Sequence, residues 1–269
     1  MKSIKLNYLI LFLLASNLVI GQSMTLALEG EEWKGVKEYK VKGRNGFKFK
    51  EKLSFGNYAS LDVDRSWTKG TEVTAGITQG IPTDEYYQRI ITTNHIHKKQ
   101  TLYFSLGDDA GNASRAYCVS RLDAKDFNVG HNSFSAVNLL LDLAGPGMES
   151  SNVFFTNIFV GPSAYGWELF LDNEAAVAHP KKYVGYLAKN DKEYYTIVPT
   201  AKVKSKKGKV SSMPFGSIGF IIRNKDGKAL AAVSLIDNGM IYLMDTDPEE
   251  QLLLATTCAV LLMRPEDLE

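Results

Sequence analysis

The sequence predicts a mainly β protein in which an antiparallel, barrel-like sheet encloses a hydrophobic C-terminal α-helix. Two observations support this fold class. Much of the chain alternates apolar and polar residues with the period of two that half-buried strands have, and turns rich in Gly, Asn and Asp separate these runs. The C-terminal segment 252–263 carries no charged residue on any side, so a helix formed by it must be surrounded by protein.

The N-terminus has the pattern of a cleavable secretory signal. Lys2 and Lys5 come before or at the start of an uncharged apolar run, residues 6–20, which ends at Gly21. A basic start, a short apolar run and a small residue at the cleavage position are what signal peptidase recognises. We therefore predict that residues 1–21 are a signal peptide and that the mature chain works outside the cytoplasm, in the periplasm or as a secreted protein.

The mature chain, residues 22–269, is expected to form a single β-rich domain without a transmembrane segment. An uncleaved membrane anchor is the alternative, but the apolar run is shorter than the roughly 20 residues that span a bilayer, and polar side chains interrupt it. Removing Lys2 and Lys5 leaves 29 basic and 30 acidic side chains. This balance argues against a nucleic-acid partner, because phosphate contacts require a basic excess. For Cys118 and Cys258 we favour two buried thiols over a disulfide bond.

Strand patterns dominate the first half of the chain. Residues 36–63 are predicted to form half-buried antiparallel strands joined by turns at Gly46 and Gly56. In the middle third, residues 101–106 and 117–119 are strand candidates on either side of a Gly- and Asp-rich turn. The run 133–143 is predicted as either a short helix or a buried strand, since periodicity alone does not separate the two.

Hairpin signals follow Gly166. Asn224-Lys225-Asp226-Gly227 and Asp237-Asn238-Gly239 lie between apolar runs, where Gly and Asn accept the positive φ of tight turns. These turns predict a meander of antiparallel strands. The expected strands are residues 167–171, 183–188, 193–198, 218–222, 228–236 and 240–243.

The C-terminal helix has a clear start. Asp247 can accept hydrogen bonds from the first free N–H groups, and Pro248 suits the first helical position. Twelve residues at about 1.5 Å each cover only about 18 Å, too short for a bilayer crossing. A closed or curved sheet around the helix is therefore expected. The alternative is a helix that covers one end of a sandwich, which would leave Thr256 and Thr257 facing water.

The last hairpins and the helix, GKALAAVSLIDNGMIYLMDTDPEEQLLLATTCAVLLM, resemble the end of the tubby-like superfamily, which includes the LURP-one-related proteins and the phospholipid scramblases. The resemblance covers roughly residues 183–263. It implies a barrel of twelve strands closed around a hydrophobic C-terminal helix. No functional residue of the family has a match in this chain, so the resemblance implies the fold and not the phosphoinositide binding known for tubby proteins.

Candidate catalytic and metal-binding residues do not form a convincing set. His95 and His97 would share one face of a strand, a spacing that can hold a metal, but Lys98 and Lys99 repel a cation and no third ligand is placed nearby. Ser163 lies between two glycines, one position away from the spacing of a nucleophile elbow. We therefore predict no catalytic residue, no metal and no cofactor.

Lysines form the candidate binding residues. Lys48, Lys50 and Lys52 would share one face of a strand, and Lys202 and Lys204 begin a second basic run. Anionic lipids or acidic glycans are the ligands that such surfaces attract. The alternative is that these lysines are solvated and discourage pairing between sheet edges.

The expected function is that of an exported, non-catalytic barrel-type domain that binds an anionic ligand, a lipid or an envelope partner. A purely structural envelope protein is a second possibility. The alternative from another class is a secreted or periplasmic hydrolase with its site in residues 70–166.

Overall fold

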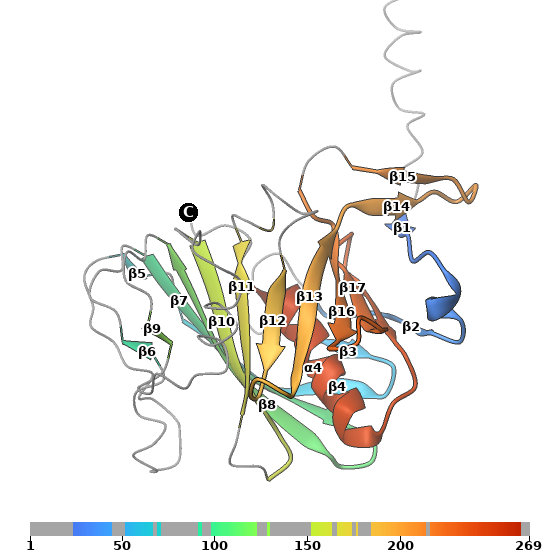
Figure 1. Ribbon diagram of the computed structural model, residues 1–269. Helices are drawn as coiled ribbons and strands as arrows, with labels where there is room; N and C mark the ends of the chain where they lie inside the picture. The colour runs from blue at the N-terminus through green and yellow to red at the C-terminus, as the bar shows by residue number, and fades with distance from the viewer. Residues whose placement is uncertain are drawn as a thin grey trace, which may run out of the picture.

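The predicted fold class is confirmed by the computed structural model, in which strands of one antiparallel sheet surround a single long helix (Figure 1). The structure describes residues 24–44, 52–66, 69–70, 91–92, 98–122, 128–129, 152–162, 166–173, 176, 184–213 and 216–264. The signal-peptide prediction lies outside these residues.

Twelve strands follow one another around the sheet, and every neighbouring pair is antiparallel. Their order is β2 (Lys37–Lys40), β18 (Met240–Leu243), β17 (Ala229–Ser234), β16 (Gly219–Asn224), β13 (Tyr194–Thr200), β12 (Gly185–Ala188), β11 (Trp167–Asp172), β10 (Asn152–Val160), β8 (Ala113–Leu122), β7 (Lys98–Asp108), β4 (Tyr58–Arg65) and β3 (Ser54–Phe55). The short strand β5 (Lys69–Gly70) pairs with β7, and β6 (Ile91–Thr92) pairs with β9 (Asn128–Val129).

The two ends of the sheet meet at one bridge. Lys42, just after β2, and Ser54, at the start of β3, exchange two backbone hydrogen bonds of 2.9 and 3.0 Å. Gly43 makes this approach possible, because a Cβ at that position would lie 1.9 Å from the backbone oxygen of Lys52. The sheet is therefore a nearly closed barrel.

The helix α4 (Pro248–Met263) runs through the middle of the barrel. Asp247 caps it by accepting a hydrogen bond of 3.0 Å from the Glu250 backbone N–H, as the sequence predicted. The helix packs against β17 and β18 on one side of the barrel and against β8 and β10 on the opposite side. Every residue from Leu252 to Met263 is buried, so the sandwich alternative is wrong.

The two helix threonines show how polar atoms are accommodated in this interior. Thr256 and Thr257 are 0% exposed, and their hydroxyls donate to the carbonyl oxygens of Leu252 and Leu253 at 2.7 and 2.8 Å. The Thr256 hydroxyl also lies 2.6 Å from the hydroxyl of Ser114 on β8. Burial therefore leaves neither group without a partner. Among the described residues, no helix is long and apolar enough to cross a membrane.

Most of the strands predicted after Gly166 are found within one to three residues of their expected bounds, and β18 is found at Met240–Leu243 as predicted. The turn at residues 107–112 also forms as expected. The Asn112 side chain donates a hydrogen bond to the Asp108 carboxylate and lowers its pKa, and hydrogen bonds from the backbone N–H groups of Asn112 and Ala110 lower it further. Residues 133–143 lie outside the described residues, and β10 was not predicted at all.

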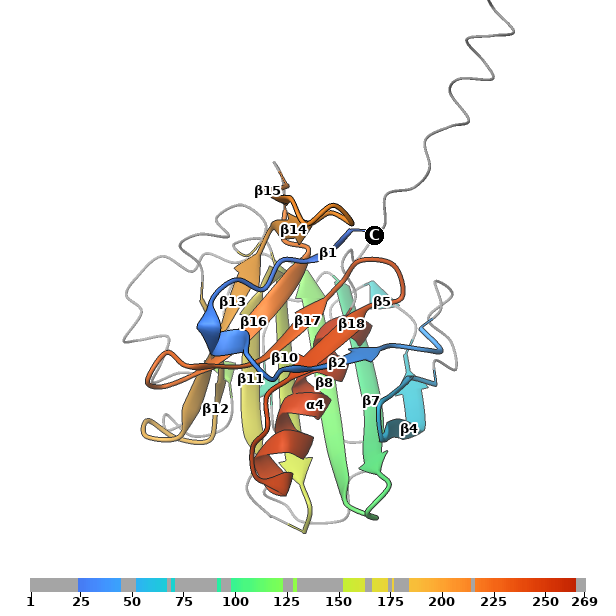
Figure 2. The same ribbon diagram turned by 90° about the vertical axis from the view of Figure 1, so that its right-hand side faces the viewer.

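Three strands form a separate small sheet at one end of the barrel (Figure 1). Strand β1 (Thr25–Leu26) pairs with β14 (Lys202–Lys204), and β14 pairs with β15 (Val210–Ser212). The segment that leads from β1 to β2 contains a short 3₁₀ helix, η2 (Glu31–Trp33), and crosses the outside of β16, β17 and β18 (Figure 2). We call residues 24–38 the N-terminal arm and residues 201–213 the lysine hairpin.

Candidate functional site

The helix and apolar side chains occupy the barrel interior, and buried arginines close one end of it. Arg65 donates a hydrogen bond of 2.8 Å to the carbonyl oxygen of Met263, at the negative end of the helix dipole. Arg264 contacts the Asn173 side chain and lies over the ring of Phe220, 4.8 Å from its centroid. These contacts hold the helix in place. Because the interior is filled, the candidate binding features lie on the outside of the barrel.

The lysine hairpin is the most basic exposed element that the structure describes. It contains five lysines and no acidic residue, and all five lysines are exposed. They are Lys202, Lys204, Lys206, Lys207 and Lys209. Val203 is buried between Lys202 and Lys204, so these two side chains share the outer face of β14, as the alternation predicted. Lys202 pairs with Glu29 of the N-terminal arm at 2.6 Å, and the other four have no described carboxylate within ion-pair distance.

Apolar side chains are exposed beside these lysines. Among the described residues, four large hydrophobic side chains are exposed, and three of them belong to the small sheet or its flanks: Met24, Val210 and Met213, at 41, 37 and 40%. The small sheet and its flanks therefore present both lysines and apolar side chains to solvent.

The first lysine group is only partly described. Lys52 is exposed and lies just before β3, in the barrel sheet, whereas Lys202 and Lys204 belong to the small sheet. Lys48 and Lys50 lie outside the described residues, so the shared face that the sequence predicted for Lys48, Lys50 and Lys52 stays a prediction.

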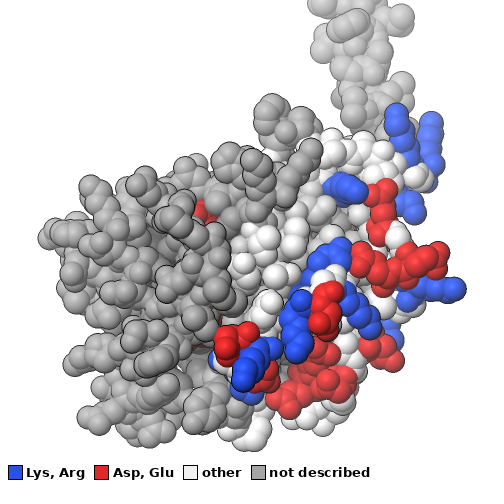
Figure 3. Space-filling model, in the orientation of Figure 1, with Lys and Arg blue, Asp and Glu red and all other residues white. Residues whose placement is uncertain are grey.

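The charges are distributed unevenly along the barrel. The space-filling view shows Lys and Arg alone at the end of the hairpin, and acidic groups mixed with basic ones toward the opposite end (Figure 3). That opposite end carries the start of α4, where Asp245, Asp247 and Glu249 are exposed.

The N-terminal arm is attached at three places, one on the small sheet and two on the barrel. Thr25 and Leu26 pair with Lys204 and Val203, and β2 pairs with β18. Between these points, Trp33 is buried in a small apolar cluster outside the barrel, together with residues of β17 and β18. Three attachments fix the arm, so the space beneath it is present before any ligand binds.

An ion pair strengthens the middle attachment. The Glu32 carboxylate accepts two hydrogen bonds, of 2.8 and 2.9 Å, from the guanidinium of Arg223 on β16. Arg223 also donates to the carbonyl oxygen of Gly227 at 2.7 Å. The hydrogen bonds from Arg223 lower the pKa of Glu32 below its ordinary value.

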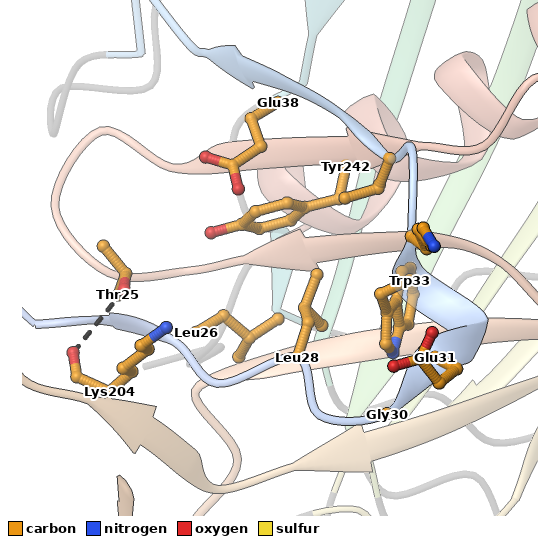
Figure 4. A pocket seen from close by; sticks show the side chains of 11 residues that line it. Thr25, Leu26, Leu28, Gly30, Glu31, Trp33, Glu38, Lys204 and Tyr242 are labelled. Atoms are coloured by element: carbon orange, nitrogen blue, oxygen red, sulfur yellow. Dashed lines mark hydrogen bonds between the residues drawn. The ribbon is translucent and has the colours of Figure 1, made fainter. Parts of the chain in front are cut away.

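A cavity of about 430 Å³ lies between the arm and the barrel (Figure 4). Leu26 and Leu28 of the arm form part of its apolar wall, and Trp33 and Tyr242 contribute aromatic rings. Four charged residues line it in equal numbers of each sign. They are Glu31, Lys34, Glu38 and Lys204.

Tyr242 presents a polar group to this cavity. Its side chain is 3% exposed, and burial, with a smaller contribution from the charge of Glu38, raises its pKa to about 12. The hydroxyl therefore stays protonated at neutral pH. It makes no hydrogen bond with a residue that the structure describes, and it is not sealed off from the cavity.

The candidate catalytic features of the sequence lie mostly outside the described residues, and these include all four histidines and Ser163. Among the described residues, no group of three or more His, Cys, Asp and Glu side chains is placed to hold a metal. Cys118 and Cys258 are buried free thiols, as expected, and burial raises the pKa of both. The described parts of residues 70–166 are mainly strands of the barrel wall. The hydrolase alternative stays a prediction.

Comparisons with known proteins add no relative: no family model matches the sequence, and neither a curated protein nor a solved structure gives a match. The relationship to the tubby-like superfamily therefore stays a prediction that rests on the C-terminal pattern.

The sequence indicated the lysines of the hairpin but not the hairpin itself or the cavity. The cavity depends on Trp33, Glu38 and Tyr242, and the last of these is about 200 residues away from the arm. Trp33 is the sequence signal that could have indicated the attachment of the arm. An aromatic residue between charged ones, in a segment with no strand pattern, indicates that the segment packs against the rest of the protein at that point.

Proposed function

We propose that this chain is an exported, non-catalytic barrel domain that binds an anionic surface of the cell envelope through the lysine hairpin. Export is supported by the N-terminal sequence, where a basic start precedes a short apolar run. The observation that carries the binding proposal is the hairpin, which combines five exposed lysines with exposed apolar side chains and no acidic residue.

A lipid bilayer is the surface that fits this combination best. Lysines near an anionic membrane each contribute about 1 kcal/mol of attraction, and neighbouring apolar side chains can enter the boundary between headgroups and acyl chains. Met24, Val210 and Met213 are available for that contact. A soluble polyanion would use the lysines but would gain little from the apolar residues.

Vesicle binding tests the proposal. The full mature protein should sediment with vesicles that contain phosphatidylglycerol, should release them as salt is raised, and should not bind vesicles of phosphatidylcholine alone. The double variant Lys206→Gln and Lys207→Gln should bind at least about tenfold more weakly, because about 2 kcal/mol of attraction is removed.

The matched control is the double variant Lys225→Gln and Lys228→Gln. These two lysines are equally exposed but lie in the turn between β16 and β17. Their replacement should leave vesicle binding nearly unchanged. An equal loss in both double variants would show that only the net charge matters, and no binding by the wild type at low salt would refute the proposal.

A further inference from the structure

The cavity beneath the N-terminal arm has the features of a small-molecule site that is separate from the hairpin surface. Its volume, about 430 Å³, lies within the range of roughly 300–1,000 Å³ that such sites have. The arm is held by strand pairing at both ends and by Trp33 and the Glu32–Arg223 ion pair in the middle. A ligand would therefore meet a formed site and would not have to order it.

Polar groups from three separated segments converge on this space. Figure 4 shows the Tyr242 hydroxyl, the Glu38 carboxylate and the Lys204 ammonium group directed into the same region, from β18, β2 and β14. The Tyr242 side chain is 3% exposed, and its hydroxyl opens onto the cavity and has no hydrogen-bond partner among the described residues. Because this hydroxyl is open to the cavity and is not used by the protein, a ligand can hydrogen-bond it without breaking a contact within the fold.

Trp33 provides a second group of the same kind. Its side chain is 6% exposed and lines the cavity, and its indole N–H has no hydrogen-bond partner among the described residues. This N–H is not shielded from solvent, so it is free to donate to a ligand in the cavity. The site thus offers two neutral aromatic groups able to donate, in addition to its charged groups.

The balance of charge narrows the class of ligand. Two carboxylates and two ammonium groups line the cavity, so a ligand with several charges of one sign would be repelled by half of them. The four charged side chains are exposed, and a purely apolar ligand would make no hydrogen bond with them or with the Tyr242 hydroxyl. A ligand with several hydroxyl groups satisfies both kinds, because each hydroxyl donates to a carboxylate and accepts from an ammonium, phenol or indole group.

We propose that the cavity between the N-terminal arm and the barrel binds a saccharide. Its hydroxyls hydrogen-bond Tyr242, Glu38 and Lys204, and its C–H face packs against Leu26 and Leu28. A sugar ring combines hydroxyl groups with an apolar C–H face. The cavity lining likewise combines polar side chains with leucines, so it suits a saccharide.

Calorimetric titration of the full mature protein tests the assignment, with cellobiose, maltose, N-acetylglucosamine and glucuronic acid as probes. At least one of them should bind with saturation. Tyr242→Phe removes only the hydroxyl and should weaken that binding by up to about tenfold, the loss expected for one hydrogen bond. Glu38→Gln changes an exposed side chain that the fold does not need, and should weaken binding severalfold.

Tyr186→Phe is the matched control, because Tyr186 lies on β12, outside the cavity, and its replacement should leave the affinity unchanged. The hairpin variant Lys206→Gln and Lys207→Gln should also keep full saccharide affinity, which separates this inference from the proposed membrane binding. No saturable binding by any saccharide, tighter binding of a zwitterion such as phosphoethanolamine, or unchanged affinity in both cavity variants would overturn the assignment.

Discussion

The interior of the barrel differs from its outer flank in the hydrogen bonding of hydroxyl groups. The flank is made of the N-terminal arm and the lysine hairpin. In the interior, the hydroxyl of Thr256 is fully buried and has two partners, Leu252 and Ser114. On the flank, the hydroxyl of Tyr242 opens onto the cavity and has no partner among the described residues. The Thr256 hydroxyl is thus satisfied within the protein, whereas the Tyr242 hydroxyl is left available to a ligand.

This difference separates stability from function. Burial of α4 on every side makes the core the main source of folding free energy. The arm and hairpin bury less and are joined to the barrel by short strand pairs, one apolar cluster and exposed or half-exposed ion pairs. Changes on the flank can therefore alter binding without unfolding the barrel, and changes in the core should do the reverse.

The largest expected effect comes from placing a charge in the interior. Leu253, Ala255, Ala259 and Leu261 point in different directions, and none is more than 2% exposed. Asp at any one of them should cost several kcal/mol, a large share of the roughly 5–15 kcal/mol that stabilises a typical domain. Thermal unfolding of the four single variants measures this cost.

Val210→Asp on the flank is the control for this comparison, since Val210 is 37% exposed and an exposed substitution usually changes stability by less than about 0.5 kcal/mol. If any of the four helix positions accepts Asp as easily as Val210 does, the helix is not enclosed and the contrast between interior and flank fails.

The interior was predictable because its signals are local. Asp247 and Pro248 mark the helix start within two residues, and the absence of charge over residues 252–263 requires protein on all sides. Turn residues such as Gly227 and Gly239, with φ of 80 and 97°, likewise indicate hairpins without reference to distant parts of the chain.

The flank was not predictable because it depends on pairs far apart in sequence. Thr25 pairs with Lys204, and Glu32 pairs with Arg223; both pairs are separated by well over a hundred residues. Strand β10 was missed for a different reason. Its side chains are buried on both faces from Val153 to Val160, so its sequence lacks the alternation of apolar and polar residues that indicates a half-buried strand.

A smaller effect distinguishes the two helix threonines. Thr256→Val removes both the bond to Leu252 and the contact that joins α4 to Ser114 on β8. Thr257→Val removes only the bond to Leu253. Thr256→Val should therefore destabilise the protein by about 1 kcal/mol more than Thr257→Val, the net value of one hydrogen bond. Chemical denaturation of both variants gives the difference, and equal stabilities would mean that the contact with Ser114 contributes nothing.

The smallest expected effect is a pH dependence of the arm, which comes from Glu32. Its pKa in the folded protein lies below the ordinary value of 4.5 because of the hydrogen bonds from Arg223. A lowered folded pKa means that the stabilisation is fully present above 4.5 and is lost as the pH falls through the folded value. The stability difference between the wild type and Glu32→Gln should therefore shrink on acidification below pH 4.5, and it should stay small throughout because the pair is about one-third exposed.

Limited proteolysis near the arm measures this effect locally, since the weakened middle attachment should expose the arm before the barrel unfolds. A difference that stays constant from neutral pH to pH 3 would show that the ion pair does not hold the arm, and the preformed cavity would then depend on Trp33 and the strand pairs alone.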